Sequence, residues 1–149
     1  MACNPEVLKQ VPLFALLDEG NQYRDRTQAI IHERFAKLFE GMGVPLVDDP
    51  LRVGYYANLD LEAWGKATFG DDFTDYVAAH HDPLEIVMAL ARRRGSVLLN
   101  GSGFEGPPWS ARVSLANLDA DDYLDIGRDM KALAERAVAL WRENEANKK

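Results

Sequence analysis

Hydrophobic and polar positions follow helical spacing over most of the 149-residue chain. Between Gln22 and Phe39, apolar residues recur every three or four positions, as on one face of a helix. Gly41 and Gly43 follow this segment and predict its end. Similar spacing predicts further helices over Pro5 to Leu17, Leu61 to Phe69, Asp72 to His81 and Pro83 to Arg94.

Three short segments favour strands instead. Val53 to Leu59 alternates apolar and polar residues, and Ser96 to Leu99 and Ala111 to Leu115 are short apolar runs. The resulting order is helix, helix, strand, helices, strand, strand, helix. This order predicts an α+β fold in which a small β-sheet has helices packed on one face, helix-rich and forming a single domain over residues 1–149.

A long terminal helix is predicted after Asp119, an N-cap residue followed by acidic Asp121 and Asp122. We expect its end, from Asn144 to Lys149, to fray. Its predicted apolar face consists of Tyr123, Ile126, Met130, Leu133, Ala137, Leu140 and Trp141.

The composition is that of an ordinary globular domain, with 47% hydrophobic and 28% charged residues. A net charge of −7 argues against nucleic acid and anionic membranes as partners. The basic run Arg92 to Arg94 is expected at a helix C-terminus, where cations are favoured. A single cysteine, Cys3, excludes a disulfide framework and fits a reducing compartment. With no signal peptide or apolar span in view, we expect a cytoplasmic protein.

Arg112 is the most informative residue for function. It lies among small and apolar neighbours in the predicted strand Ser110 to Leu115, where burying an unpaired charge would cost several kcal/mol. A guanidinium group matches a carboxylate in planar, bidentate fashion. The residues alone leave two interpretations open: a carboxylate clamp, or a structural arginine paired with an acid such as Asp119 or Glu105.

Other candidate motifs are weaker. The run from Asn100 to Gly103 looks like a phosphate cradle, but no helix follows it directly, so we expect a shaped loop in which Gly101 and Gly103 supply positive φ or close approach. Tyr55 and Tyr56 are expected to face opposite sides of a strand, one of them the core. Adjacent histidines, His80 and His81, diverge by about 100° on a helix, so no metal site is expected.

Together, these segments resemble the C-terminal small domain of fold-type I pyridoxal-phosphate enzymes, the class I/II aminotransferases. Within that family, the aspartate 4-decarboxylases are most similar. The resemblance is carried by Leu13 to Asp18, Gly54 to Tyr56, Gly70 to Phe73, Val97 to Pro107, Trp109-Ser110 and the arginine strand up to Asn117.

The resemblance implies that Arg112 binds the substrate's α-carboxylate, with Asn100 and Tyr55 as further substrate-binding residues. It implies pyridoxal phosphate as cofactor, L-aspartate as substrate, and either decarboxylation to alanine and CO2 or transamination. It also implies a homo-oligomer, because this family builds its active sites at a dimer interface.

The chain departs from the family in lacking the large domain, which supplies the Schiff-base lysine. None of its six lysines lies in the sequence context of that residue. We therefore expect no catalytic, cofactor-binding or metal-binding residue here, and a substrate-side part that is inactive alone. Residues 1–19 would form a helix joining a missing large domain. The alternative is a non-catalytic carboxylate-binding or protein-interaction module derived from such a small domain.

Overall fold

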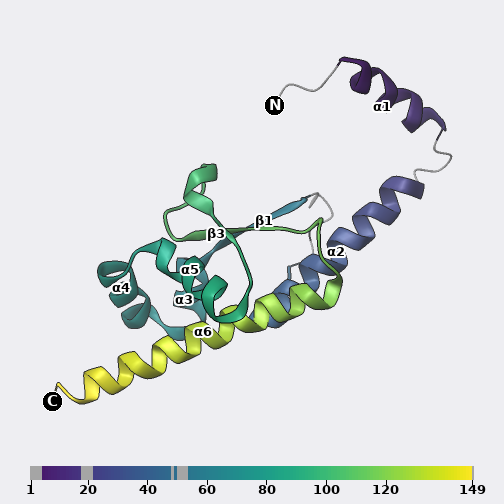
Figure 1. Ribbon diagram of the computed structural model, residues 1–149. Coiled ribbons are helices and arrows are strands. Elements are labelled where there is room, and N and C mark those ends of the chain that lie inside the picture. The colour runs from purple at the N-terminus through teal and green to yellow at the C-terminus, as the bar shows by residue number, and fades with distance from the viewer. Residues whose placement is uncertain (1–4, 18–21, 48, 50–53, 149) are drawn as a thin grey trace.

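The computed structural model describes residues 5–17, 22–47, 49 and 54–148. Two long helices, α2 (Gln22–Met42) and α6 (Ala120–Ala146), cross beside a smaller α/β body. The first helix, α1 (Pro5–Leu17), lies apart from that body, beyond the start of α2 (Figure 1). The Phe14 and Tyr23 rings meet edge to face, with their centroids 5.4 Å apart.

The sheet has three antiparallel strands in the order β1-β3-β2. These strands are β1 (Tyr56–Asp60), β2 (Leu99–Asn100) and β3 (Ser110–Ser114). The predicted strand from Ser96 is thus paired only at its end, while Val53 lies outside the described residues. The strand with the arginine is central, a position that the sequence did not reveal.

Helices α3 (Leu61–Phe69), α5 (Pro83–Arg94) and α6 pack against the strands, and α4 (Asp71–His80) packs on α3 (Figure 1). The two α5 boundaries are as predicted, because Asp82 accepts a hydrogen bond from Leu84 N at 2.8 Å and Gly95 adopts a φ of 74°. The helix-rich α+β prediction is confirmed. Buried core residues include Leu59, Leu61, Val87, Leu90, Leu98, Ala111, Val113, Leu115, Tyr123 and Met130.

The end predicted for α2 at Gly41 is wrong. Gly41 is buried inside the helix and faces Gly127 of α6, and a Cβ added at Gly41 would lie 2.9 Å from the Gly127 Cα. Glycine is needed there because the two backbones approach each other directly. The helix ends at Met42, and Gly43 follows with a φ of 74°.

The α6 helix begins as predicted but continues further. The Asp119 backbone N donates to Asp122 Oδ2 at 3.1 Å, which closes the first turn. The helix then extends to Ala146, two residues beyond the start of the predicted frayed tail at Asn144. Its predicted apolar face is only partly buried, since Leu140 is 53% exposed.

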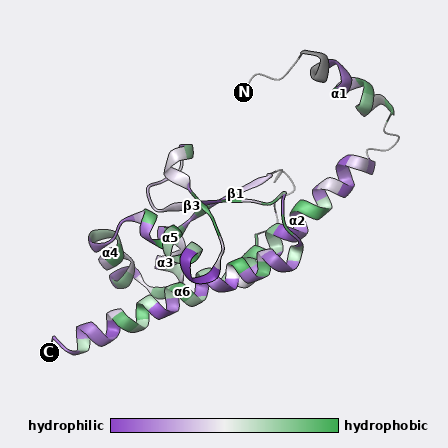
Figure 2. Cartoon of the chain, in the orientation of Figure 1, coloured by the Kyte–Doolittle hydropathy of each residue, from purple (hydrophilic) through white to green (hydrophobic). Residues whose placement is uncertain are grey.

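Polar residues interrupt the apolar positions along both long helices (Figure 2). Within the described ranges, no helix combines the length and apolar character needed to cross a bilayer.

Candidate carboxylate-binding site

Arg112 lies at the centre of the outer face of the sheet. Its neighbours Ala111 and Val113 point inward and are buried, so alternation along β3 places Arg112 on the opposite face. There the Arg112 Cζ lies 3.9 Å from the centroid of the Tyr56 ring and 4.4 Å from that of Phe104. Both separations are within the range of cation–π attraction, so the two rings hold the guanidinium in place.

The guanidinium group of Arg112 has unused hydrogen-bonding capacity. Its Nε is buried and has no hydrogen-bond partner. Among the described residues, no ion pair joins Arg112 to Asp119, to Glu105 or to any other acid. The interpretation as a structural arginine paired with one of these acids is therefore not supported. An unpaired, partly buried guanidinium is suited to donate hydrogen bonds to a carboxylate.

Phe104 reaches Arg112 because the glycine-rich run folds into a 3-10 turn, η2 (Gly101–Phe104), rather than a loop. The Asn100 Oδ1 caps this turn by accepting from Ser102 N and from Ser102 Oγ, both at 3.1 Å. Gly101 allows the predicted close approach, since a Cβ there would lie 2.9 Å from the Ser110 Cβ. The same expectation is wrong for Gly103, which has open space around it and no positive φ.

The structure does not bring Asn100 to the Arg112 guanidinium. The register places Asn100 opposite Ala111 and Arg112 opposite Leu99, so the two residues belong to alternate faces. The side-chain oxygen of Asn100, Oδ1, accepts hydrogen bonds from Ser102. A role for Asn100 in substrate binding stays a prediction, and its observed role is to shape the turn.

The tyrosine that contacts Arg112 is Tyr56, whereas the sequence favoured Tyr55. Tyr55 precedes β1, and its side chain is 57% exposed. Its carbonyl accepts from Leu115 N at 2.6 Å. The expectation that one tyrosine faces the core is wrong, because Tyr56 is also exposed, at 51%, and Ala57 takes the first inward position.

The sequence analysis did not identify Tyr56 and Phe104 as the residues that contact Arg112, although strand alternation contained part of the information. Tyr56 pairs with Ser114, two residues from Arg112, so it is a diagonal neighbour on the same face. Strand alternation could have identified it once the register was known. Phe104 could not be found this way because it comes from a turn.

The described lysines do not provide a Schiff-base site. Four of them lie on helices, and Lys148 lies just beyond the end of α6. Ion pairs with acids three or four residues away are formed by Lys37, Lys66, Lys131 and Lys148. Lys66 donates to Glu62 at 2.8 Å, and this hydrogen bond raises the pKa of the Lys66 amine above its ordinary value. An amine held protonated is a poor nucleophile, so Lys66 does not fit covalent attachment of pyridoxal phosphate.

The histidines have local partners rather than a metal-binding arrangement. His81 Nδ1 lies 3.0 Å from Glu85 Oε2, and His80 Nδ1 lies 2.8 Å from the Tyr76 carbonyl. Within the part of the chain that the structure describes, no group of three or more metal-ligating side chains is present.

The helix-rich α+β fold is the one expected from the resemblance to aminotransferases, and a comparison with known proteins bears on that resemblance directly. Over 130 residues, 87% of the chain, the sequence is 34% identical to a bifunctional aspartate aminotransferase and L-aspartate beta-decarboxylase from a Pseudomonas species. The resemblance inferred from the sequence is thus confirmed. The chain spans 24% of that relative's length. No protein-family model matches the chain.

Proposed function

We propose that this chain is the substrate-side part of a pyridoxal-phosphate-dependent enzyme acting on L-aspartate, in which Arg112 binds the α-carboxylate. The observation that carries the proposal is the Arg112 guanidinium, half-buried on the outer face, held by two rings and without an acidic partner among the described residues. Similarity to the Pseudomonas aminotransferase and decarboxylase supports aspartate as the substrate.

In this proposal, the chain positions the substrate and performs no proton transfer. A guanidinium group has donors and no acceptor, so Arg112 can hold and orient a carboxylate but cannot act as a base. Pyridoxal phosphate, when bound, supplies an electron sink for the reacting bonds. The groups that hold it would lie outside the described residues. Self-association of the complete enzyme and a cytoplasmic location belong to the same proposal.

The Arg112 Nε–H can be observed directly by NMR, since its signal is the one lost in Arg112→Lys. Titration with L-aspartate and L-asparagine, which both keep the α-carboxylate, should shift this signal. The α-amide of aspartate lacks that group and should leave the signal unchanged. Equal shifts with all three ligands would contradict recognition of the α-carboxylate.

A chimera tests the catalytic part of the proposal. The 130-residue segment of the Pseudomonas relative is replaced by the matching segment of this chain, and aspartate turnover is measured. We expect turnover, with a raised KM when Arg112→Lys is introduced. A folded chimera without turnover, combined with a specific shift at Arg112 in the chain alone, would favour the second candidate, a non-catalytic carboxylate-binding module. That candidate is supported by the described lysines, four of which form ion pairs with nearby acids.

A further inference from the structure

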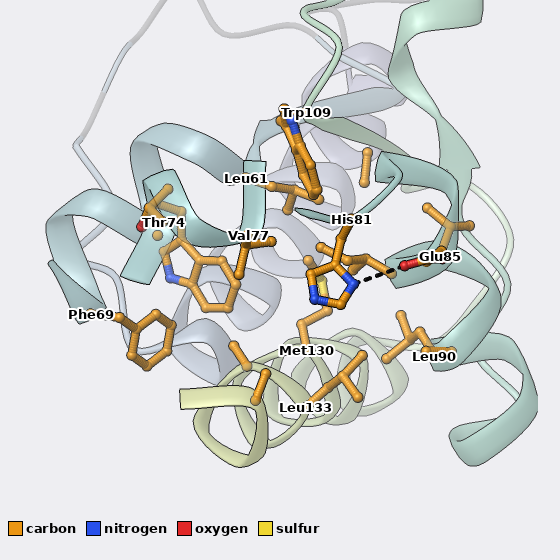
Figure 3. Close-up of a pocket in the computed structure, with 18 of the residues that line it drawn as sticks. Leu61, Phe69, Thr74, Val77, His81, Glu85, Leu90, Trp109, Met130 and Leu133 are labelled. Atoms are coloured by element: carbon orange, nitrogen blue, oxygen red, sulfur yellow. Dashed lines mark hydrogen bonds and ion pairs between the residues drawn. The ribbon is translucent and has the colours of Figure 1, made fainter. Parts of the chain in front are cut away.

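A second candidate binding site lies on the inner side of the sheet. A cavity of about 390 Å³ opens between α3, α4, α5 and α6, within the range of about 300–1,000 Å³ typical of small-molecule sites. Figure 3 shows Leu61, Leu90, Met130 and Leu133 around this space, with Trp109 at one side. Its lining is almost entirely apolar, so its occupant needs an apolar body.

The charged residues that line the cavity leave an excess of positive charge. Glu62 forms an ion pair with Lys66 at 2.8 Å, and Glu85 Oε2 lies 3.0 Å from His81 Nδ1, a contact that is an ion pair only when His81 is protonated. Arg93 of α5 and Arg136 of α6 also line the cavity, and neither has an ion pair with any acid that the structure describes. Both lining carboxylates therefore have a close side-chain partner, whereas the two lining arginines have no acidic partner among the described residues.

This cavity is separate from the carboxylate site on the outer face. Ala111 lines the cavity, while Arg112, the next residue of β3, points to the opposite side of the sheet. A ligand in the cavity would therefore meet neither Tyr56 nor Phe104.

We propose that the cavity binds an anionic amphiphile, a medium-chain carboxylate whose apolar chain enters between α3, α4 and α6 and whose carboxylate meets Arg93 and Arg136. The apolar lining selects the chain, and the two unpaired guanidinium groups select the head group. A cationic amphiphile would fill the same space but meet like charge.

Binding can be measured with decanoate below its micelle concentration. Two of the chain's three tryptophans, Trp64 and Trp109, line the cavity, so their fluorescence should change saturably on titration. Octanoate should bind more weakly by about threefold to fourfold per missing methylene. Decyltrimethylammonium, with the opposite head-group charge, should bind more weakly than decanoate. Failure of decanoate to saturate the signal would overturn the proposal.

Charge variants test whether decanoate binds Arg93 and Arg136 specifically or responds only to the positive charge of the surface. Replacing Arg93→Gln together with Arg136→Gln should weaken decanoate binding about tenfold, since each exposed ion pair contributes up to about fivefold. The matched control is Arg92→Gln with Arg142→Gln, which removes equal charge from the same helices at positions outside the lining. The control pair should leave decanoate binding unchanged. Equal weakening by both pairs would overturn the proposal.

Two further variants test the place of binding. Ala134→Phe, which fills the cavity from α6, should abolish decanoate binding, and Arg112→Lys should not affect it. Loss of binding in Arg112→Lys alone would show that decanoate occupies the outer face and would overturn the proposal. Sedimentation addresses the other possible occupant, a second copy of this chain. Self-association that is abolished by Ala134→Phe but not displaced by decanoate would likewise overturn it.

Discussion

The guanidinium carbon of Arg112 lies 3.9 Å from the centroid of the Tyr56 ring, across the β1–β3 pair. Tyr56 is the diagonal neighbour of Arg112 in the register, whereas Asn58 is directly opposite. The ring therefore restricts the position of the guanidinium through a cation–π contact.

This relationship predicts different effects for two adjacent tyrosines. Tyr56→Ala should weaken the binding of L-aspartate by about twofold to fivefold, because an exposed cation–π contact contributes about 0.5–1 kcal/mol. Tyr56→Phe should retain affinity, since the ring remains. Tyr55→Ala is the matched control and should have no effect, because the Arg112 contact is made by Tyr56. Affinities are read from the Arg112 Nε–H shift, and equal losses in both alanine variants would contradict the assignment.

The α2–α6 crossing predicts an unusual response to alanine. Alanine normally stabilises a helix relative to glycine by about 1 kcal/mol. At Gly41 or Gly127, however, an added Cβ meets the other helix's backbone, with the opposite Cα at 2.9 Å. Gly41→Ala and Gly127→Ala should each lower the free energy of unfolding by about 1–3 kcal/mol, the usual cost of overpacking.

Urea denaturation measures this effect, with Gly103→Ala as control. Gly103 has no heavy atom within 4 Å of an added Cβ, so its replacement should stay within about 0.5 kcal/mol of the parent chain. Increased stability in Gly41→Ala would show that the two helices do not meet at these glycines.

Tyr123 ties α6 to the central strand. Its side chain is fully buried, and its hydroxyl donates to the Ser114 carbonyl at 2.7 Å. Tyr123→Phe should lower the free energy of unfolding by about 1–2 kcal/mol, because the Ser114 carbonyl loses its partner. The same change at exposed Tyr55 should be neutral within about 0.5 kcal/mol. Similar values for the two variants, from urea denaturation, would argue against this hydrogen bond.

Lys66 should titrate above its ordinary pKa. The hydrogen bond to Glu62, then the negative charge of Glu62, raise the pKa of the Lys66 amine above 10.5, and Asp75 at 3.5 Å contributes less. Because the folded pKa is the raised one, the associated stabilisation is present below the unfolded pKa and is lost as pH rises through the folded pKa. NMR titration of Lys66 should show this, and Glu62→Gln should lower the pKa. An unchanged pKa in that variant would contradict the stated cause.

The lysine environments also predict the outcome of cofactor labelling. The hydrogen bonds of Lys66 to Glu62 and of Lys148 to Glu145 raise the pKa of both amines, and a protonated amine does not attack an aldehyde. Mixing the chain with one equivalent of pyridoxal phosphate, followed by borohydride reduction, should yield no stoichiometric adduct at one lysine in the mass spectrum. A single labelled lysine, with labelling perturbed by aspartate, would reveal a cofactor site that the described geometry does not suggest.

The sequence by itself determined most of the helices. The predicted bounds of α3 and α5 hold, because capping residues and helical periodicity are local signals. The asparagine and glycines before Phe104 predicted a shaped loop, and the arginine within a short apolar strand indicated carboxylate chemistry as one of two interpretations. These inferences depend on residues a few positions apart, whose interactions are local and depend little on the rest of the fold.

Only the tertiary structure decided which residues meet. Strand order made β3 central, and register placed Tyr56 rather than Tyr55 beside Arg112. Gly41 contacts Gly127 of α6 instead of ending α2. The sequence could not predict this contact because the two glycines are far apart along the chain. The apolar cavity likewise exists only between four helices. Such features depend on long-range packing, which local periodicity does not encode.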